Sequence, residues 1–183
     1  MVRPKHTRTT LVRLLRTIRL DASDTFVFAR AAEPGEWAVP GTFAFLDAAP
    51  EAITGKRRAA FRGGFLGTDG WGWSTLVMVT DAPPGAVEAM TEALARHFVE
   101  AYGAPSPAAA REVAEREVAF AAGLCEHPVG TLLTVRREHG PEGVVERFAT
   151  VTRDPLADEA DGGTEFGSFD LIALAAKGGG GSA

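Results

Sequence analysis

The segment Trp73–Thr80, Trp-Ser-Thr-Leu-Val-Met-Val-Thr, is apolar on both parities in its second half. Strands that face solvent on one side alternate apolar and polar residues, whereas strands covered on both sides do not. The segment therefore predicts a central strand of a sheet. Such a strand requires neighbouring elements that can cover both of its faces.

A helical hairpin is predicted to supply part of this cover. After Pro83-Pro84, apolar residues three and four positions apart form one stripe that ends at Gly103, as expected of an amphipathic helix. Ser106 and Pro107 suit an N-cap and a first helical position, so a second helix is predicted from there to about Leu124.

The rest of the pattern predicts strands. Residues 12–20 and 25–30 are rich in β-branched, leucine and aromatic residues and flank a polar turn. An edge or bulged strand is expected over 37–45, because Pro40 cannot donate to a ladder, and alternation over 57–66 indicates a strand with one basic face. Strands over 130–137 and 144–153 follow the helices. The predicted fold class is α+β: a mainly antiparallel sheet of about seven strands, five before the helical hairpin and two after it, with the hairpin packed on one face.

Three regions are predicted along the chain. Residues 1–10 form a flexible basic arm without apolar periodicity, residues 11–153 form a single domain, and residues 154–183 form an acidic, glycine-rich tail. The tail holds one apolar island, Phe166–Ala176, that fits either a docked strand or a docked helix. Its end, Gly178–Ala183, has the composition of an engineered linker.

The composition argues against disulfide-bonded, membrane-spanning and nucleic-acid-binding proteins. The chain has one cysteine, Cys125, which excludes an internal disulfide and fits a reducing compartment. It has no run of about 18 consecutive apolar residues, the length needed to span a bilayer. We therefore expect a cytoplasmic protein without a membrane partner. The net charge of −5, with basic residues concentrated before Asp21, argues against nucleic-acid binding. A protein partner or homo-oligomer is expected instead.

Several segments resemble a known family. They are Leu14 to Phe28, Leu-Leu-Arg-Thr-Ile-Arg-Leu-Asp-Ala-Ser-Asp-Thr-Phe-Val-Phe, then Pro34-Gly-Glu-Trp-Ala-Val-Pro-Gly-Thr-Phe, and Gly63-Gly-Phe-Leu-Gly. The chain is similar, over about residues 11–153, to a family of small bacterial proteins known only as a domain of unknown function. The resemblance implies a bacterial cytosolic origin and supplies no activity.

A candidate pocket centres on Glu117. On a helical wheel this acid falls inside the apolar arc of the second helix, so its carboxylate is expected to face the sheet, where burial and charged neighbours shift pKa values. Arg16 and His97 are the predicted partners of Glu117. A structural ion pair explains the same pattern, and it is the simpler interpretation.

Cys125 joins the candidate pocket, but its chemistry is limited. Cys125 and His127 lie two residues apart on a helix, so their side chains point about 200° from each other. No metal-binding spacing and no cofactor signature is present, so no metal site is predicted and no cofactor can be named. No enzyme class has a positive signature.

A candidate interface combines tryptophan and arginine, the residue types that dominate binding hot spots. Its members are Trp71, Trp73, Arg58 and Arg62, which accompany the glycine-rich run 63–72. That run lacks the Gly-Lys-Ser/Thr end of a phosphate loop and favours a turn. The sequence therefore favours a non-catalytic accessory or assembly protein that binds another protein through this segment and an exposed sheet edge. The alternative is a small-molecule or cofactor-binding protein, enzymatic or not, with a pocket around Glu117.

Overall fold

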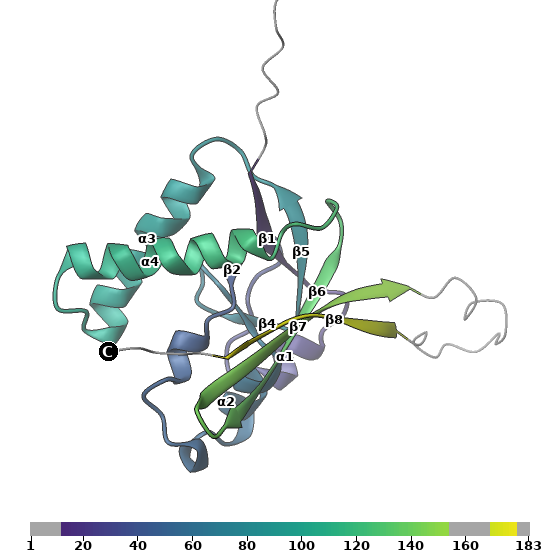
Figure 1. The fold of residues 1–183 in the computed structure, drawn as a ribbon, viewed down its shortest axis with the longest axis horizontal. Coiled ribbons are helices and arrows are strands. Elements are labelled where there is room, and N and C mark those ends of the chain that lie inside the picture. The colour runs from purple at the N-terminus through teal and green to yellow at the C-terminus, as the bar shows by residue number, and fades with distance from the viewer. Residues whose placement is uncertain (1–11, 154–168, 179–183) are drawn as a thin grey trace, which may run out of the picture.

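A computed structural model describes residues 12–153 and 169–178, which form one antiparallel sheet with helices packed on it (Figure 1). The eight strands lie in the order β4-β3-β2-β1-β5-β6-β7-β8. Their bounds are β1 Arg13–Ile18, β2 Trp37–Val39, β3 Phe65–Gly67, β4 Trp73–Ser74, β5 Leu76–Asp81, β6 Leu132–Gly140, β7 Gly143–Arg153 and β8 Phe169–Gly178. The predicted α+β class is confirmed. The predicted arm 1–10 and segments 154–168 and 179–183 lie outside the described residues.

β1 is the strand that joins the two halves of the sheet. It pairs with β2 at Leu15↔Ala38 and with β5 along its whole length, from Arg13↔Asp81 to Ile18↔Leu76. From β1 the chain builds outward to β4, returns to the other side of β1 with β5, and builds outward again to β8. β8 pairs with β7, so the sheet continues beyond residue 153.

The helical hairpin forms as predicted. Helix α3 spans Ala86–Tyr102 and ends at Gly103, whose φ of 63° is the left-handed conformation that glycine tolerates best. Helix α4 spans Pro107–Gly123, and the Ser106 hydroxyl accepts the N–H of Ala109 at 3.2 Å. The two helices pack against each other, and α4 also packs on β1 and β2.

The main core lies between this hairpin and one face of the sheet. Val77 on β5 is in register with Leu133 on β6, and Val135 is in register with Phe148 on β7, so these side chains share a face. The sheet is curled, because Phe65 on β3 approaches Phe148 with ring centroids 6.2 Å apart. The core includes Met90, Leu94, Phe98, Ala110, Ala114, Val118 and Ala121 from the hairpin, and Cys125 just after it.

Three strands predicted before the helices are wrong in whole or in part. Residues 25–30 do not form a strand: helix α1 spans Ser23–Val27. The predicted strand 37–45 stops at Val39 and is followed by the 3₁₀ helix η1, Thr42–Phe45. The predicted strand 57–66 is mostly helix α2, Gly55–Gly63, and only its end belongs to β3. A second 3₁₀ helix, η2, spans Pro50–Ala52.

Local chemistry explains these differences. Asp21 accepts the N–H of Ser23, and the Thr25 hydroxyl donates to the carbonyl of Ala22, which favours a turn and a short helix over a hairpin. The Lys, Arg and Ala residues of α2 are good helix formers, and its buried residues are adjacent, Ala60 and Phe61. They pack in a second, smaller core with Phe28, Phe45 and Ile53.

Candidate functional site

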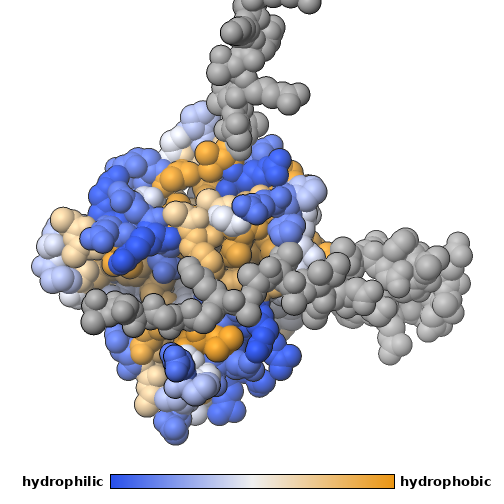
Figure 2. All heavy atoms as spheres, in the orientation of Figure 1, coloured by the Kyte–Doolittle hydropathy of each residue, from blue (hydrophilic) through white to orange (hydrophobic). Residues whose placement is uncertain are grey.

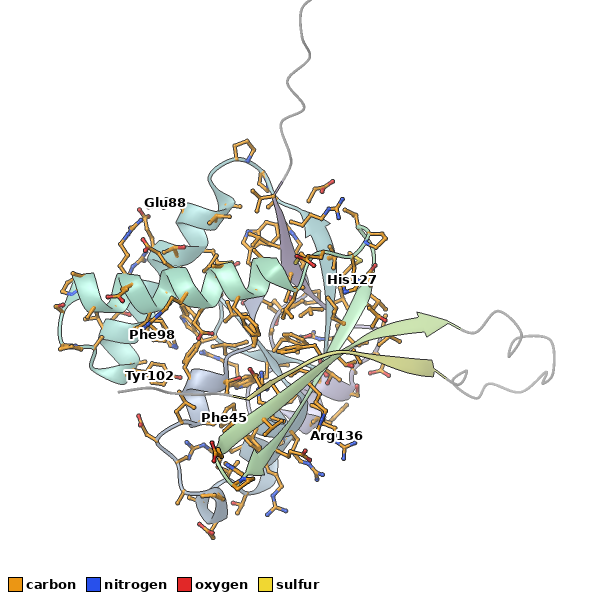
Figure 3. All side chains as sticks on the ribbon, in the orientation of Figure 1. Phe45, Glu88, Phe98, Tyr102, His127 and Arg136 are labelled. Carbon is orange, nitrogen blue, oxygen red and sulfur yellow. The ribbon has the colours of Figure 1, made fainter. Side chains whose placement is uncertain are left out.

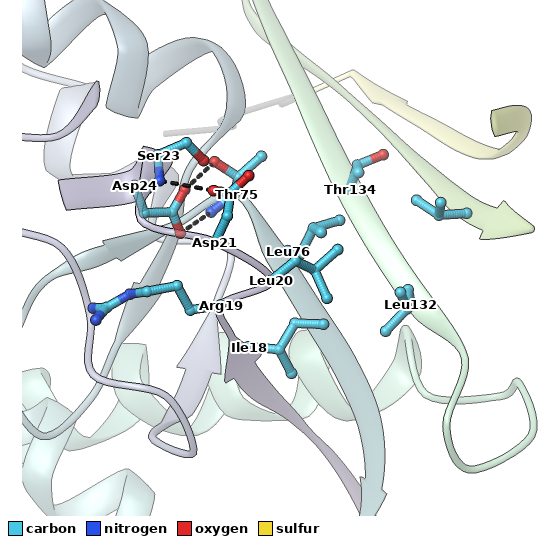
Figure 4. Close-up of a pocket in the computed structure, with 11 residues that line it drawn as sticks. Ile18, Arg19, Leu20, Asp21, Ser23, Asp24, Thr75, Leu76, Leu132 and Thr134 are labelled. Carbon is cyan, nitrogen blue, oxygen red and sulfur yellow. Dashed lines mark hydrogen bonds between the residues drawn. The ribbon is translucent and has the colours of Figure 1, made fainter. Parts of the chain in front are cut away.

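The face of the sheet opposite the helical hairpin holds an apolar hollow of about 320 Å³. We call it the open-face hollow. Strands β1, β5, β6 and β7 meet along its floor, where Leu76 is in register with Ile18 and Leu132 with Val151. It is lined by Ile18, Arg19, Leu20, Asp21, Ser23, Asp24, Thr75, Leu76, Leu132, Thr134 and Val151. Figure 4 shows Ile18, Leu76 and Leu132 projecting into the same space from neighbouring strands.

The rim of the open-face hollow is held by hydrogen bonds. The buried carboxylate of Asp24 accepts the hydroxyl of Thr75 at 2.6 Å and the backbone N–H of Thr75 at 3.1 Å. These bonds tie α1 to the residue between β4 and β5. Because both carboxylate oxygens of Asp24 accept a hydrogen bond from Thr75, this buried acid stabilises the rim.

Apolar surface continues outward from the open-face hollow. Leu20 on the rim is 64 % exposed, and Phe26 and Val27 on α1 are 74 % and 43 % exposed. Residues three and four apart share a helix face, so Phe26 and Val27 lie on the same side of α1 as the lining residue Ser23. By contrast, the outer surface of the helical hairpin, at the left of Figure 2, is mostly hydrophilic.

Glu117 is half-buried on α4 and does not line the open-face hollow. Its charge acts on Arg137: burial lowers the pKa of this guanidinium, while Glu146 and, more weakly, Glu117 oppose the shift. Glu117 is thus within electrostatic range of a buried arginine on β6, whose ion pair is with Glu146.

The other residues of the candidate pocket lie in separate environments. Arg16 stacks its guanidinium 3.9 Å from the centre of the Trp37 ring and donates to the carbonyl of Gly35. Cys125 is buried and donates to the carbonyl of Ala121 at 3.4 Å. Burial raises the pKa of the Cys125 thiol to about 12, so the thiolate is scarce at neutral pH.

His97, a residue of the predicted pocket, contacts Trp71, a residue of the predicted interface. Their rings stack with centroids 3.6 Å apart and planes 4° from parallel. Burial lowers the pKa of His97, and Glu100 partly offsets this shift. Trp71 has a φ of 54°, a conformation that bulky residues rarely adopt, so the stack is kept despite local backbone strain.

The remaining interface candidates do not adjoin this stack. Trp73 is half-buried and packs on Phe45, with ring centroids 5.1 Å apart. Arg58 and Arg62 are exposed on α2 and line a different groove, between α2 and β6. The predicted interface is therefore divided over two surfaces.

The glycine-rich segment forms a turn around a carboxylate of the chain itself. Glu36 is buried, and its Oε2 accepts the N–H of Asp69 at 3.0 Å and of Gly70 at 2.8 Å. A Cβ atom at Gly67 would lie 2.5 Å from this oxygen, so glycine is required there. The segment therefore forms a turn, as its glycines predict, and its backbone N–H groups bind a carboxylate of the chain itself.

Comparison with known proteins places the chain in a family. A family model described as a family of unknown function (DUF6505) matches residues 12–160. The chain belongs to this family. No match is found among curated proteins or among solved structures. The predicted resemblance to a family of unknown function is thus confirmed, and membership of DUF6505 assigns no activity.

Arg137 is the buried residue of this DUF6505 chain that sequence reasoning missed. Its Nε donates to Glu146 at 2.7 Å and to the Thr42 hydroxyl at 2.8 Å, and its two terminal nitrogens donate to the carbonyls of Pro40, Phe61 and Gly64. A signal was present in the sequence, because Arg137 shares strand parity with the inward residues Leu133 and Val135.

The described part of the DUF6505 chain shows neither a metal-binding cluster nor a membrane-spanning helix. In residues 12–153 and 169–178, no three His, Cys, Asp or Glu side chains are arranged to hold a metal ion. None of the helices in these ranges is long and apolar enough to cross a bilayer.

Proposed function

We propose that this chain is a non-catalytic accessory or assembly protein of the bacterial cytoplasm that binds another protein through the open-face hollow. The observation that carries the proposal is an apolar hollow on a sheet face opposite the helices, continued by the exposed apolar side chains of Leu20, Phe26 and Val27. Contiguous exposed apolar surface is typical of protein-binding sites.

The chemistry of the hollow supports binding more than catalysis. Its polar rim groups are engaged with one another, Asp24 with Thr75 and Asp21 with Ser23. The single thiol, Cys125, is buried elsewhere and protonated at neutral pH. A lone buried cysteine also fits the reducing cytoplasm.

A partner protein fits this surface better than a small molecule does. A small ligand in the hollow would leave Phe26 and Val27 on α1 in water, whereas an apolar segment of a protein covers both. Covering Leu20, which is 64 % exposed, contributes about 1–2 kcal/mol by the usual scale for burying a leucine. We therefore expect Leu20 to be an anchor contact.

The test uses two leucines of equal exposure. Leu20 is 64 % exposed on the rim, and Leu46 is 65 % exposed but does not line the hollow. Immobilised wild-type protein, Leu20→Asp and Leu46→Asp are each incubated with lysate of the source cells, and retained proteins are quantified by mass spectrometry. The leading species is then purified and its Kd is measured against all three forms.

We expect Leu20→Asp to weaken binding of that protein by at least about tenfold, and Leu46→Asp to leave it within about twofold. Equal Kd values for wild type and Leu20→Asp would remove the hollow from the interface. Because both leucines are exposed, neither variant is expected to disturb folding, which circular dichroism checks.

A second candidate function is small-molecule binding in the same hollow. Its volume of about 320 Å³ lies at the lower end of the range for ligand pockets. Native mass spectrometry of the purified protein distinguishes this case: a bound molecule that Thr134→Trp displaces would favour it over a protein partner.

A further inference from the structure

A second concave site lies between α2 and β6, on the part of the molecule where Figure 3 shows Arg136. β6 pairs with β5 only at Leu132 and Leu133, so further along this edge its described strand neighbour is β7 alone. Helix α2 packs along that edge and leaves a groove of about 200 Å³. Its lining includes Arg58, Phe61, Arg62, Arg136, Glu138 and His139.

The charges of this groove do not balance. Arg137 is committed to Glu146, and Glu138 forms an ion pair with Arg147. Among residues 12–153, Arg58 and Arg62 form no ion pair, and Arg136 acts electrostatically only on Glu138, whose ion pair is with Arg147. Three arginines without an ion pair of their own therefore line one small hollow of a chain whose net charge is −5.

Two of these arginines repel each other on α2. Arg58 and Arg62 are four residues apart, and like charges at this spacing destabilise a helix. Arg62 lies in the last turn, where a cation suits the helix dipole, so the unfavourable part is the repulsion between the two guanidinium groups. A bound anion would offset this repulsion.

The groove also fixes the geometry of its donors. The Nε of Arg58 donates to the carbonyl of Ile53 at 3.2 Å, which orients the side chain. His139 stacks on Phe61 with ring centroids 4.5 Å apart and planes 14° from parallel, so one wall is flat and aromatic. Planar guanidinium groups recognise tetrahedral oxyanions by paired hydrogen bonds.

We propose that this groove binds the phosphate group of a small ligand, with Arg58 and Arg62 donating to its oxygens and Arg136 adding positive charge. Three arginines match a phosphate dianion better than a single carboxylate. The aromatic wall favours a phosphate monoester that carries a planar group over free phosphate. This groove shares no lining residue with the open-face hollow, so the phosphate proposal does not depend on protein binding at the hollow.

The test titrates the full chain with inorganic phosphate and with phenyl phosphate at constant ionic strength, and follows backbone amide shifts by NMR. Arg62→Gln and Arg58→Gln are compared with Arg57→Gln, a matched control. Arg57 lies on the same helix and loses the same charge, but it does not line the groove and acts electrostatically on Tyr102 instead.

We expect saturable binding that Arg62→Gln and Arg58→Gln each weaken about tenfold, as loss of one charge-assisted hydrogen bond predicts, while Arg57→Gln stays within about twofold. Tighter binding of phenyl phosphate identifies a monoester as the ligand, and equal binding identifies free phosphate. Absence of saturation for both probes, or an equal effect of Arg57→Gln and Arg62→Gln, overturns the proposal.

Discussion

Removal of the Arg137 side chain should be among the most damaging single changes to the stability of this protein. Arg137 is 1 % exposed, and its guanidinium donates to five oxygens: those of Glu146 and Thr42, and the carbonyls of Pro40, Phe61 and Gly64. These acceptors come from β7, from the segment after β2, and from the end of α2 and the residue after it. One side chain thus connects both halves of the curled sheet.

The magnitude follows from what each substitution leaves behind. Arg137→Met leaves the largely buried Glu146 carboxylate without its cation and three carbonyls without this donor, which costs about 3–5 kcal/mol. Glu146→Gln keeps an acceptor for the Arg137 Nε but leaves the buried guanidinium without its counter-charge, which also costs about 3–5 kcal/mol. In the double variant the carboxylate is absent as well, so its loss of stability should be at least about 1 kcal/mol smaller than the sum.

Urea unfolding of the four proteins, followed by tryptophan fluorescence and circular dichroism, measures these free energies. The dependence on urea should be unchanged, because the folded state exposes no additional surface. A loss under about 1 kcal/mol for Arg137→Met would refute the reasoning. So would strict additivity in the double variant, because it would mean that the two side chains do not interact.

Two further predictions concern the titratable groups. Cys125, whose thiol pKa burial raises to about 12, should react with a disulfide reagent at neutral pH only at the rate of unfolding; stoichiometric reaction within seconds in the native state would contradict its burial. Because the pKa of His97 is lowered from 6.5 in the folded state, its contribution to stability is complete above pH 6.5 and is lost as the pH falls through the lowered value. The melting temperature should therefore drop more steeply from about pH 8 to about pH 5 in wild type than in His97→Phe, which keeps a ring against Trp71 but cannot titrate; parallel curves would contradict this assignment.

Helices α3 and α4 and strands β6 and β7 were predictable because the local sequence pattern of each segment is sufficient to indicate its secondary structure. Ser106, Pro107 and Gly103 mark the ends of α3 and α4 directly, and the long β6 and β7 lie where their alternation predicts. The region between β1 and β5 was not predictable in the same way. There, elements of two to nine residues depend on contacts with distant residues, such as that between Asp24 and Thr75.

The candidate site was harder to predict than the fold. The open-face hollow exists because four strands from distant parts of the sequence lie side by side and the helices cover the opposite face. None of its residues is unusual in its own segment. Glu117 was conspicuous for the opposite reason, since an acid in an apolar stripe stands out locally, although its electrostatic neighbour Arg137 lies on another element.

The central position of β1 has a consequence for synthesis of the protein. Of the described strands β1 leaves the ribosome first, but β5, the neighbour that pairs with its whole length, is translated only after β2, β3 and β4. Until then Leu14 and Leu15 lack both this partner and the helices that later bury them. A nascent chain that stops before residue 76 therefore presents an apolar strand with one unpaired edge, a form prone to aggregation. Completion of the sheet depends on the second half of the chain reaching back to the first strand made.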